Sequence, residues 1–150
     1  MKKYFLVLMS LLLCACSPHP EQMVKPSYWL NSDLAGPDVD RNGIRDDVDA
    51  WIAAQPFTVP QKRAAEQFAR TMQASMAEQY KTRKDIKRMG DQIGMAINCM
   101  ASQFDQFDHV ADAVISETLN TKVRILKQDA NDEMASGMVF ESYYGENTCE

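Results

Sequence analysis

The sequence predicts an all-α protein, a small helical bundle preceded by an acidic loop. Apolar residues recur every three or four positions over long stretches, which places them on one face of a helix. Alternation of the kind that strands show is nearly absent, and the best example, Met138-Val139-Phe140, is too short to build a sheet. The length outside the N-terminal segment is enough for one hydrophobic core, so we expect a single domain.

The first two helices are expected on either side of Pro56. Val48, Trp51 and Ile52 fall at helical spacing, so a short helix should run to about Gln55, where the following proline ends it. Thr58-Val59-Pro60-Gln61 has the pattern of a capping box with proline in the first turn, which predicts the start of a long helix. The apolar stripe of that helix comprises Ala65, Phe68, Met72, Met76 and Tyr80.

Two further helices are expected to complete the bundle. The stripe of the third comprises Ile86, Met89, Ile93, Ala96, Met100, Phe104 and Phe107. A fourth should begin at about Val110 and end at Ser136-Gly137, because glycine after a periodic stretch is a common helix stop. Its inward residues should be Val114, Ile115, Leu119, Val123, Leu126 and Ala130.

The acidic loop, Asp38–Asp49, holds five carboxylates and one side-chain amide in twelve residues. Oxygen atoms at places 1, 3, 5, 7, 9 and 12, with a turn-permitting glycine at place 6, are what Ca²⁺ requires. Gly43 stands at place 6, where a positive φ carries no steric cost. The predicted ligands are Asp38, Asp40, Asn42, the backbone carbonyl of Ile44, Asp46 and Asp49.

This pattern resembles the calcium loops of thrombospondin type 3 repeats and, more loosely, the EF-hand loop. It departs from the EF-hand in having its apolar residue, Ile44, at place 7 and in having Gly36-Pro37 where a helix would enter. The resemblance covers these twelve residues in a single copy and lacks the cysteines of thrombospondin repeats. The alternative is an acidic turn that caps the next helix through Asp46 or Asp47.

Residues 1–15 have the features of a signal peptide. Lys2 and Lys3 precede a short apolar run from Phe5 to Leu13, which is too short for a lasting membrane span. Leu13-Cys14-Ala15-Cys16 resembles a bacterial lipobox, which implies that Cys16 is lipidated and becomes the first mature residue. Ser17 after it is similar to lipoproteins sorted to the outer membrane, facing the periplasm. The alternative is an ordinary secretory signal cleaved nearby.

The mature chain divides into a tether, residues 16–37, and a domain, residues 38–150. Prolines punctuate the tether and no hydrophobic period persists in it. Without Lys2 and Lys3 the chain keeps 14 basic against 21 acidic residues, a net charge of −7, which argues against nucleic acid as a partner.

The lipobox assignment also bears on the cysteines. Cys14 would leave with the signal and Cys16 would carry lipid, so Cys99 and Cys149 would be left in an oxidising compartment. We expect these two to form one disulfide. Neither lies in a Cys-x-x-Cys pair or beside a histidine, which disfavours a redox or nucleophilic role.

Two other charged clusters have more ordinary interpretations. The basic residues Lys81, Arg83, Lys84, Lys87 and Arg88 favour a solvated turn between helices over a patch for anionic lipid headgroups or cell-wall polymer. Asp105, His109 and Asp112 could share a helix face and bind a transition metal, but one histidine with carboxylates makes a weak zinc site. An exposed helix start capped by Asp108 is favoured.

No catalytic motif is present, so we do not expect an enzyme. The expected function is a structural or protein-binding role of a membrane-anchored, calcium-binding lipoprotein, with an envelope protein as partner. The alternative is a lipoprotein inhibitor or immunity protein that blocks a toxin or hydrolase in the envelope.

Overall fold

The computed structural model describes residues 34–143 and 147–150, and the part of the chain that it describes is helical without a strand. The prediction of an all-α bundle is therefore confirmed. The helices are α2 (Asp46–Ala54), α3 (Val59–Ala77), α4 (Arg83–Gln103), α5 (Phe107–Thr118) and α6 (Lys122–Ala135).

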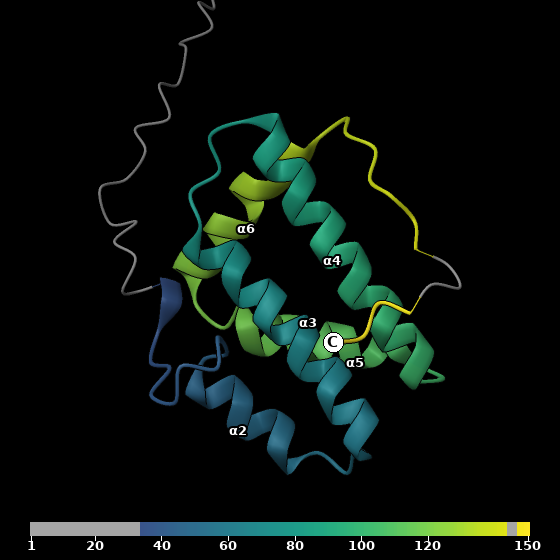
Figure 1. Ribbon diagram of the computed structural model, residues 1–150. Coiled ribbons are helices and arrows are strands. Elements are labelled where there is room, and N and C mark those ends of the chain that lie inside the picture. The colour runs from purple at the N-terminus through teal and green to yellow at the C-terminus, as the bar shows by residue number, and fades with distance from the viewer. Residues whose placement is uncertain (1–33, 144–146) are drawn as a thin grey trace, which may run out of the picture.

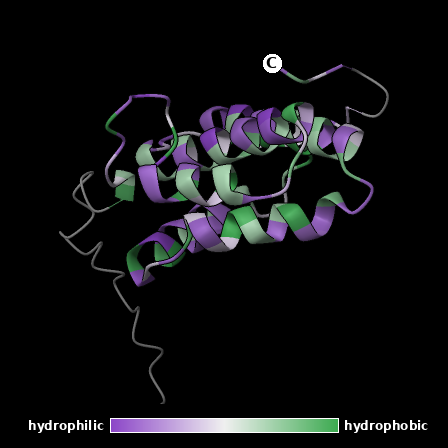
Figure 2. Cartoon of the chain, turned by 90° about the horizontal axis from the view of Figure 1, so that it is seen from below, coloured by the Kyte–Doolittle hydropathy of each residue, from purple (hydrophilic) through white to green (hydrophobic). Residues whose placement is uncertain are grey.

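Helix α3 is the centre of the bundle. Helices α2, α4, α5 and α6 all pack against it (Figure 1). The short connection from Glu78 to Thr82 makes α3 and α4 run in roughly opposite directions, as short connections between packed helices do. Each helix carries hydrophobic and hydrophilic stretches (Figure 2), as expected when every helix presents one face to a shared core.

The core contains much of the predicted apolar stripes. Ala65, Phe68, Met72 and Met76 of α3 are buried, as are Ile86, Met89, Ala96 and Met100 of α4. The Phe57 and Phe104 rings meet edge to face with 5.0 Å between their centroids, and this pair closes the core beyond the carboxyl end of α4. Local periodicity was thus sufficient to orient both long helices.

The predicted capping box at the start of α3 is present. The Thr58 N–H donates to the Gln61 side-chain oxygen at 3.0 Å, and the Gln61 N–H donates to the Thr58 hydroxyl at 3.5 Å. A second capping box starts α4, where Thr82 and Asp85 exchange the equivalent bonds. Both boxes satisfy N–H groups that a helix start leaves without intrahelical partners.

The predicted stop at Ser136-Gly137 is confirmed, because α6 ends at Ala135. The predicted end of the third helix and the continuity of the fourth were wrong. Helix α4 stops at Gln103, and Phe107 begins α5 instead of ending the third stripe. The single helix expected from Val110 to Ser136 is two helices, because Thr121 caps a new start by accepting from the Arg124 N–H at 3.4 Å. Asp108 is not the cap of α5; it lies in the first turn after Gln106.

Helix α6 also faces the bundle differently from the prediction. Leu126 was expected inside, but it is 38% exposed, whereas Arg124, Lys127 and Asn131 are buried. This polar face matches polar neighbours: Arg124 Nε donates to the Leu34 carbonyl at 3.1 Å, and Asn131 Nδ2 donates to a carbonyl of α3 at 3.2 Å. Burial lowers the pKa of Lys127, whose ammonium lies 5.3 Å from the Tyr80 ring centroid.

The chain after α6 returns along α4 (Figure 1). A Cβ atom on Gly90 would lie 2.0 Å from the ring of Phe140, and one on Gly94 would lie 3.4 Å from the ring of Tyr143. The returning segment therefore lies closely over a glycine-lined face of α4, where a larger side chain at Gly90 would displace Phe140.

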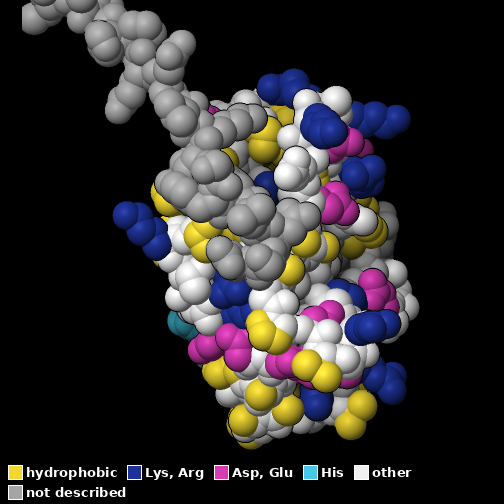
Figure 3. All heavy atoms as spheres, turned by 90° about the vertical axis from the view of Figure 1, so that its left-hand side faces the viewer, with side chains coloured by type: hydrophobic (Ala, Val, Ile, Leu, Met, Phe, Trp, Pro, Cys, Tyr) yellow, Lys and Arg dark blue, Asp and Glu magenta, His cyan; other side chains and the backbone are white. Residues whose placement is uncertain are grey.

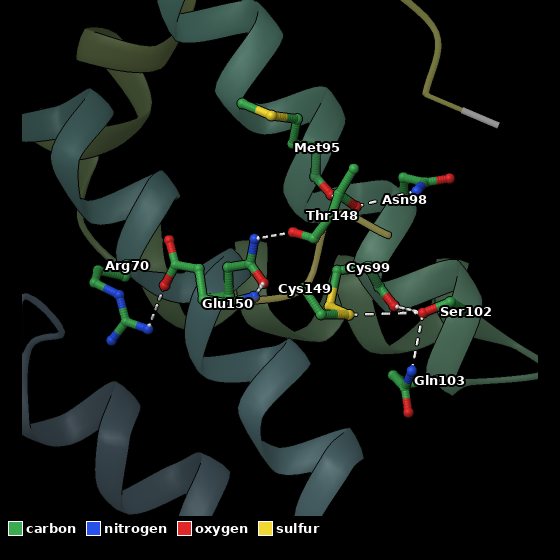
Figure 4. Close-up of a disulfide and its surroundings, with 10 residues drawn as sticks. Arg70, Met95, Asn98, Cys99, Ser102, Gln103, Thr148, Cys149 and Glu150 are labelled. Carbon is green, nitrogen blue, oxygen red and sulfur yellow. Dashed lines mark hydrogen bonds and ion pairs between the residues drawn. A yellow bond between two sulfur atoms is a disulfide. The ribbon is translucent and has the colours of Figure 1, made fainter. Parts of the chain in front are cut away.

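The predicted disulfide, Cys99–Cys149, fixes the end of this returning segment to α4 (Figure 4). Thr148 adds hydrogen bonds on the same helix: its hydroxyl donates to the Met95 carbonyl at 2.7 Å and accepts from Asn98 Nδ2 at 3.0 Å. Gln67 of α3 donates to the Thr148 carbonyl at 2.8 Å, so the segment also joins the two long helices.

Replacing both Cys99 and Cys149 with serine should lower the free energy of unfolding by up to about 4 kcal/mol. The cross-link spans 50 residues and restricts the unfolded chain accordingly. Denaturant titration measures the loss. Ser102→Ala, which removes a hydroxyl beside the disulfide and leaves the bridge intact, is the control and should change stability much less. Equal stability of the oxidised protein and the double variant would contradict this account.

Candidate metal centre

The acidic loop folds back on itself immediately before α2. The Asp46 N–H donates to the Pro37 carbonyl at 2.9 Å, which closes the loop at its base. Arg41 and Gly43 adopt positive φ values of 60° and 84°, and these turns reverse the chain. Asp38 accepts from the N–H groups of Asn42 at 3.1 Å and Gly43 at 3.0 Å, so its carboxylate lies inside the turn.

Three carboxylates converge in this loop. One oxygen each of Asp38, Asp40 and Asp46 lie within 4.8 Å of one another, and no other such group of acidic, histidine or cysteine side chains occurs among residues 34–143 and 147–150. The amide nitrogen of Asn42 lies 3.2 Å from a carboxylate oxygen of Asp40 and 3.2 Å from one of Asp49. Asp49 thereby joins the edge of the cluster.

The carboxylates of the loop are suitable ligands for a hard cation, whereas the Asn42 side chain is not oriented to bind one. Oxygen ligands without nitrogen or sulfur suit Ca²⁺ rather than zinc or copper. The Asn42 amide oxygen, however, accepts from the Ile44 N–H at 2.8 Å, and its NH₂ group faces the carboxylates. The Asn42 side chain would have to turn over, and give up that bond, before its oxygen could act as a ligand. The Ile44 side chain is buried in the core.

Arg70 of α3 braces the outside of the loop. Its guanidinium donates to the Asn42 carbonyl at 3.3 Å. It also donates to the Glu150 carboxylate at 3.2 Å (Figure 4). A Cβ atom on Gly43 would lie 3.0 Å from the Arg70 side chain, so this position needs glycine for space as well as for its positive φ. Residue 70 is far along the chain, so no local pattern in the sequence indicates this contact.

Arg45 fastens the inside of the loop and is only 2% exposed. Its guanidinium donates to both carboxylate oxygens of Asp47, to the Thr118 carbonyl at 3.2 Å and to the Glu117 carbonyl at 2.7 Å. The loop is thus hydrogen-bonded to the carboxyl end of α5. No pattern in the sequence indicates that Arg45 is buried or that it reaches α5.

The Asp47 carboxylate remains charged beside this arginine. Partial burial pushes its pKa upward, but hydrogen bonds from Arg45, the positive charge of Arg45 and bonds from Asn120 and the Val48 N–H outweigh that effect. The pKa of Asp47 is therefore lower than usual. Asp47 is bonded to Arg45 and does not belong to the group of converging carboxylates.

The second candidate metal site does not form. Asp105, His109 and Asp112 are exposed and are not brought together. Their positions at the turn before α5 and on its outer face explain their polar character. The predicted signal peptide, the lipobox with Cys16 and most of the predicted tether lie outside the described residues. None of the described helices is long and apolar enough to cross a membrane.

Arg45→Met should lower the free energy of unfolding by about 2 to 3 kcal/mol. The methionine stem preserves packing, but the Glu117 and Thr118 carbonyls and the Asp47 carboxylate lose a charged donor. Thermal unfolding is the measurement. Arg41→Met, at an exposed position of the same loop, is the matched control and should change stability by less than about 0.5 kcal/mol. Similar losses in both variants would show that Arg45 does not have this role.

Comparison of the chain with models of protein families, with curated proteins and with solved structures finds no match in any of the three. The function must therefore be argued from the residues and their arrangement.

Proposed function

We propose that this protein is a lipid-anchored lipoprotein of the bacterial envelope whose helical domain binds one Ca²⁺ ion and has a structural or protein-binding role. The observation that carries the calcium assignment is the convergence of Asp38, Asp40 and Asp46 in a twelve-residue loop with the ligand spacing of known calcium loops. Asp49 and a reoriented Asn42 would complete the side-chain ligands, with the Ile44 carbonyl between them.

Electrostatics favours an ion at this place. Converging carboxylates repel one another, and the two arginines that hold the loop in place are already engaged: Arg45 binds Asp47 and backbone carbonyls, and Arg70 binds Asn42 and Glu150. A divalent cation would supply the missing positive charge. Ca²⁺ accepts irregular sets of oxygen ligands, whereas Mg²⁺ demands a tighter octahedron and gives up water reluctantly.

A structural role follows from the way the loop packs against the core. Ile44 and Val48 insert into the core on either side of the buried Arg45, and α2 begins inside the loop. An ion that holds the loop closed would therefore stabilise the packing of α2 against α3. Because binding to the folded chain alone adds to its stability, the domain should be more resistant to unfolding where calcium is plentiful.

The anchor is supported by the sequence Leu13-Cys14-Ala15-Cys16 after a basic and then an apolar segment. Acylation of Cys16 would hold the domain at a membrane through the tether that follows. An anchored domain of this kind, with no catalytic constellation in its sequence, is suited to binding or supporting another envelope component.

Calcium should raise the melting temperature of the chain that begins at Ser17. At a free calcium concentration a hundredfold above Kd, the gain in unfolding free energy should be about 2.7 kcal/mol. Thermal unfolding with calcium and with EDTA measures it, and calorimetry measures binding directly. Asp38→Ala and Asp40→Ala should remove most of the gain, because both carboxylates belong to the converging group.

Asp129→Ala is the matched control, since it removes an exposed carboxylate of α6 away from the loop and should keep the full calcium effect. Identical melting curves with calcium and EDTA, together with no heat of binding, would reduce the loop to an acidic turn that starts α2.

Cys16→Ala should abolish incorporation of a fatty-acid analogue and leave the precursor uncleaved or the protein free of the membrane. The reason is that the acyl chains are attached to this thiol after the lipobox. Metabolic labelling followed by gel analysis is the measurement, with Cys14→Ala as the control that should still be labelled. Unchanged labelling of the Cys16 variant would show that the lipid is attached to another residue.

A further inference from the structure

The connection between α3 and α4 and the first turns of α4 carry more cations than form ion pairs with nearby acidic side chains. Lys87 is paired with Asp91 at 2.8 Å and with Glu141 at 3.8 Å. Arg88 is paired with Glu78 at 3.5 Å and with Asp85 at 4.0 Å. The nearby acidic side chains are therefore accounted for by these two cations.

Three cations remain, Lys81, Arg83 and Lys84, and together they form what we call the basic turn. All three are exposed, and none has an ion pair with any described residue. Figure 3 shows several Lys and Arg side chains at the upper end of the molecule and others spread over the rest of this face, and the chain as a whole has a net charge of −5. The basic turn thus has the opposite sign to the chain as a whole.

The stability of α4 does not explain these cations. Arg83 and Lys84 are the first two residues of α4, where the helix dipole disfavours positive charge. The capping carboxylate of Asp85 is occupied by the Thr82 hydroxyl at 2.8 Å and by the Thr82 and Lys81 N–H groups. The hydrogen bond from Thr82 is the largest of the effects that lower the pKa of Asp85. The positive charges at the start of α4 oppose the helix dipole, and this favours a role for them in binding an anion.

The described chain begins close to this end of the bundle. Gln73 of α3 donates to the Ala35 carbonyl, four residues before α3 ends at Ala77. Four residues of helix rise about 6 Å, so the chain enters the domain near the end of α3 that leads into the basic turn. Between Cys16 and Leu34 there are eighteen peptide steps, which span at most about 60 Å. A lipid on Cys16 would keep the basic turn within reach of the same bilayer.

We propose that the basic turn docks onto anionic phospholipid headgroups and thereby orients the domain on the membrane. This inference rests on the lipid anchor of the proposed function. Each lysine or arginine near an anionic surface strengthens binding about fivefold, so three give roughly a hundredfold. That is weak for a free protein but is sufficient as the second signal beside an acyl chain. The acidic remainder of the surface would be repelled by the same leaflet.

The test uses the purified, acylated protein in vesicles of phosphatidylcholine and in vesicles of phosphatidylcholine mixed with phosphatidylglycerol, without calcium. A water-soluble amine reagent labels exposed lysines, and mass spectrometry compares Lys81, Lys84 and Lys87 with Lys122 at the start of α6. Labelling of the first three should slow at least tenfold relative to Lys122 on the anionic vesicles only. Added salt should restore it, because the attraction is screened.

Variants assign the protection to the basic turn. With Lys81, Arg83 and Lys84 all replaced by glutamine, Lys87 remains as the reporter and should be labelled equally on both kinds of vesicle. The control replaces three cations elsewhere, Arg41, Lys62 and Arg63, and should keep Lys87 protected. Equal labelling of the wild-type protein on both vesicles, or protection that persists in the turn variant, would overturn the proposal.

Two further experiments distinguish the lipid anchor, the docking of the basic turn and the binding of free anions. Flotation with neutral vesicles reports the anchor alone, so a protein that floats but shows no protection refutes the docking and not the lipoprotein assignment. A protein that floats only with anionic vesicles, in a salt-sensitive way, refutes the anchor and supports the docking. Inorganic phosphate that protects the lysines on neutral vesicles, at an ionic strength where chloride does not, would show a site for free anions and overturn the choice of lipid.

Discussion

The buried guanidinium of Arg45 is the interaction on which the acidic loop and the second half of the bundle both depend. Arg45 lies in the sequence between two core residues, Ile44 and Val48. Its guanidinium donates to the Glu117 and Thr118 carbonyls of α5. Those carbonyls belong to the last turn of α5, which has no intrahelical donors for them. One side chain therefore satisfies the end of one helix and fixes the start of another, α2.

The features that could be predicted from sequence are those that neighbouring residues determine. The stripe of α3, the Thr58 capping box and the disulfide each follow from spacing or residue type within a short stretch or from counting thiols. The break between α5 and α6 depends partly on a bond from a residue more than seventy positions away. The hydrophobic period alone continues through Leu119 and Val123, so the two helices looked like one.

The candidate metal site divides in the same way. The clustering of Asp38, Asp40 and Asp46 follows from a glycine turn with alternating acidic residues, a local pattern. The supports of that cluster come from distant elements: Arg70 from α3 and the α5 carbonyls that hold Arg45. The inward polar face of α6 was missed for the same reason, because the carbonyls of Leu34 and α3 that need its donors are far away in sequence.

The glycines of α4 make that helix and the segment returning over it a single cooperative unit. A glycine in a helix interior costs about 1 kcal/mol relative to alanine, so Gly90 and Gly94 weaken α4 when it stands alone. The rings of Phe140 and Tyr143 occupy the space that the missing side chains leave. During folding, the middle of α4 should therefore gain its full stability only after Phe140 and Tyr143 have docked on it. The middle of α4 is thus completed by a segment that lies about fifty residues further along the chain.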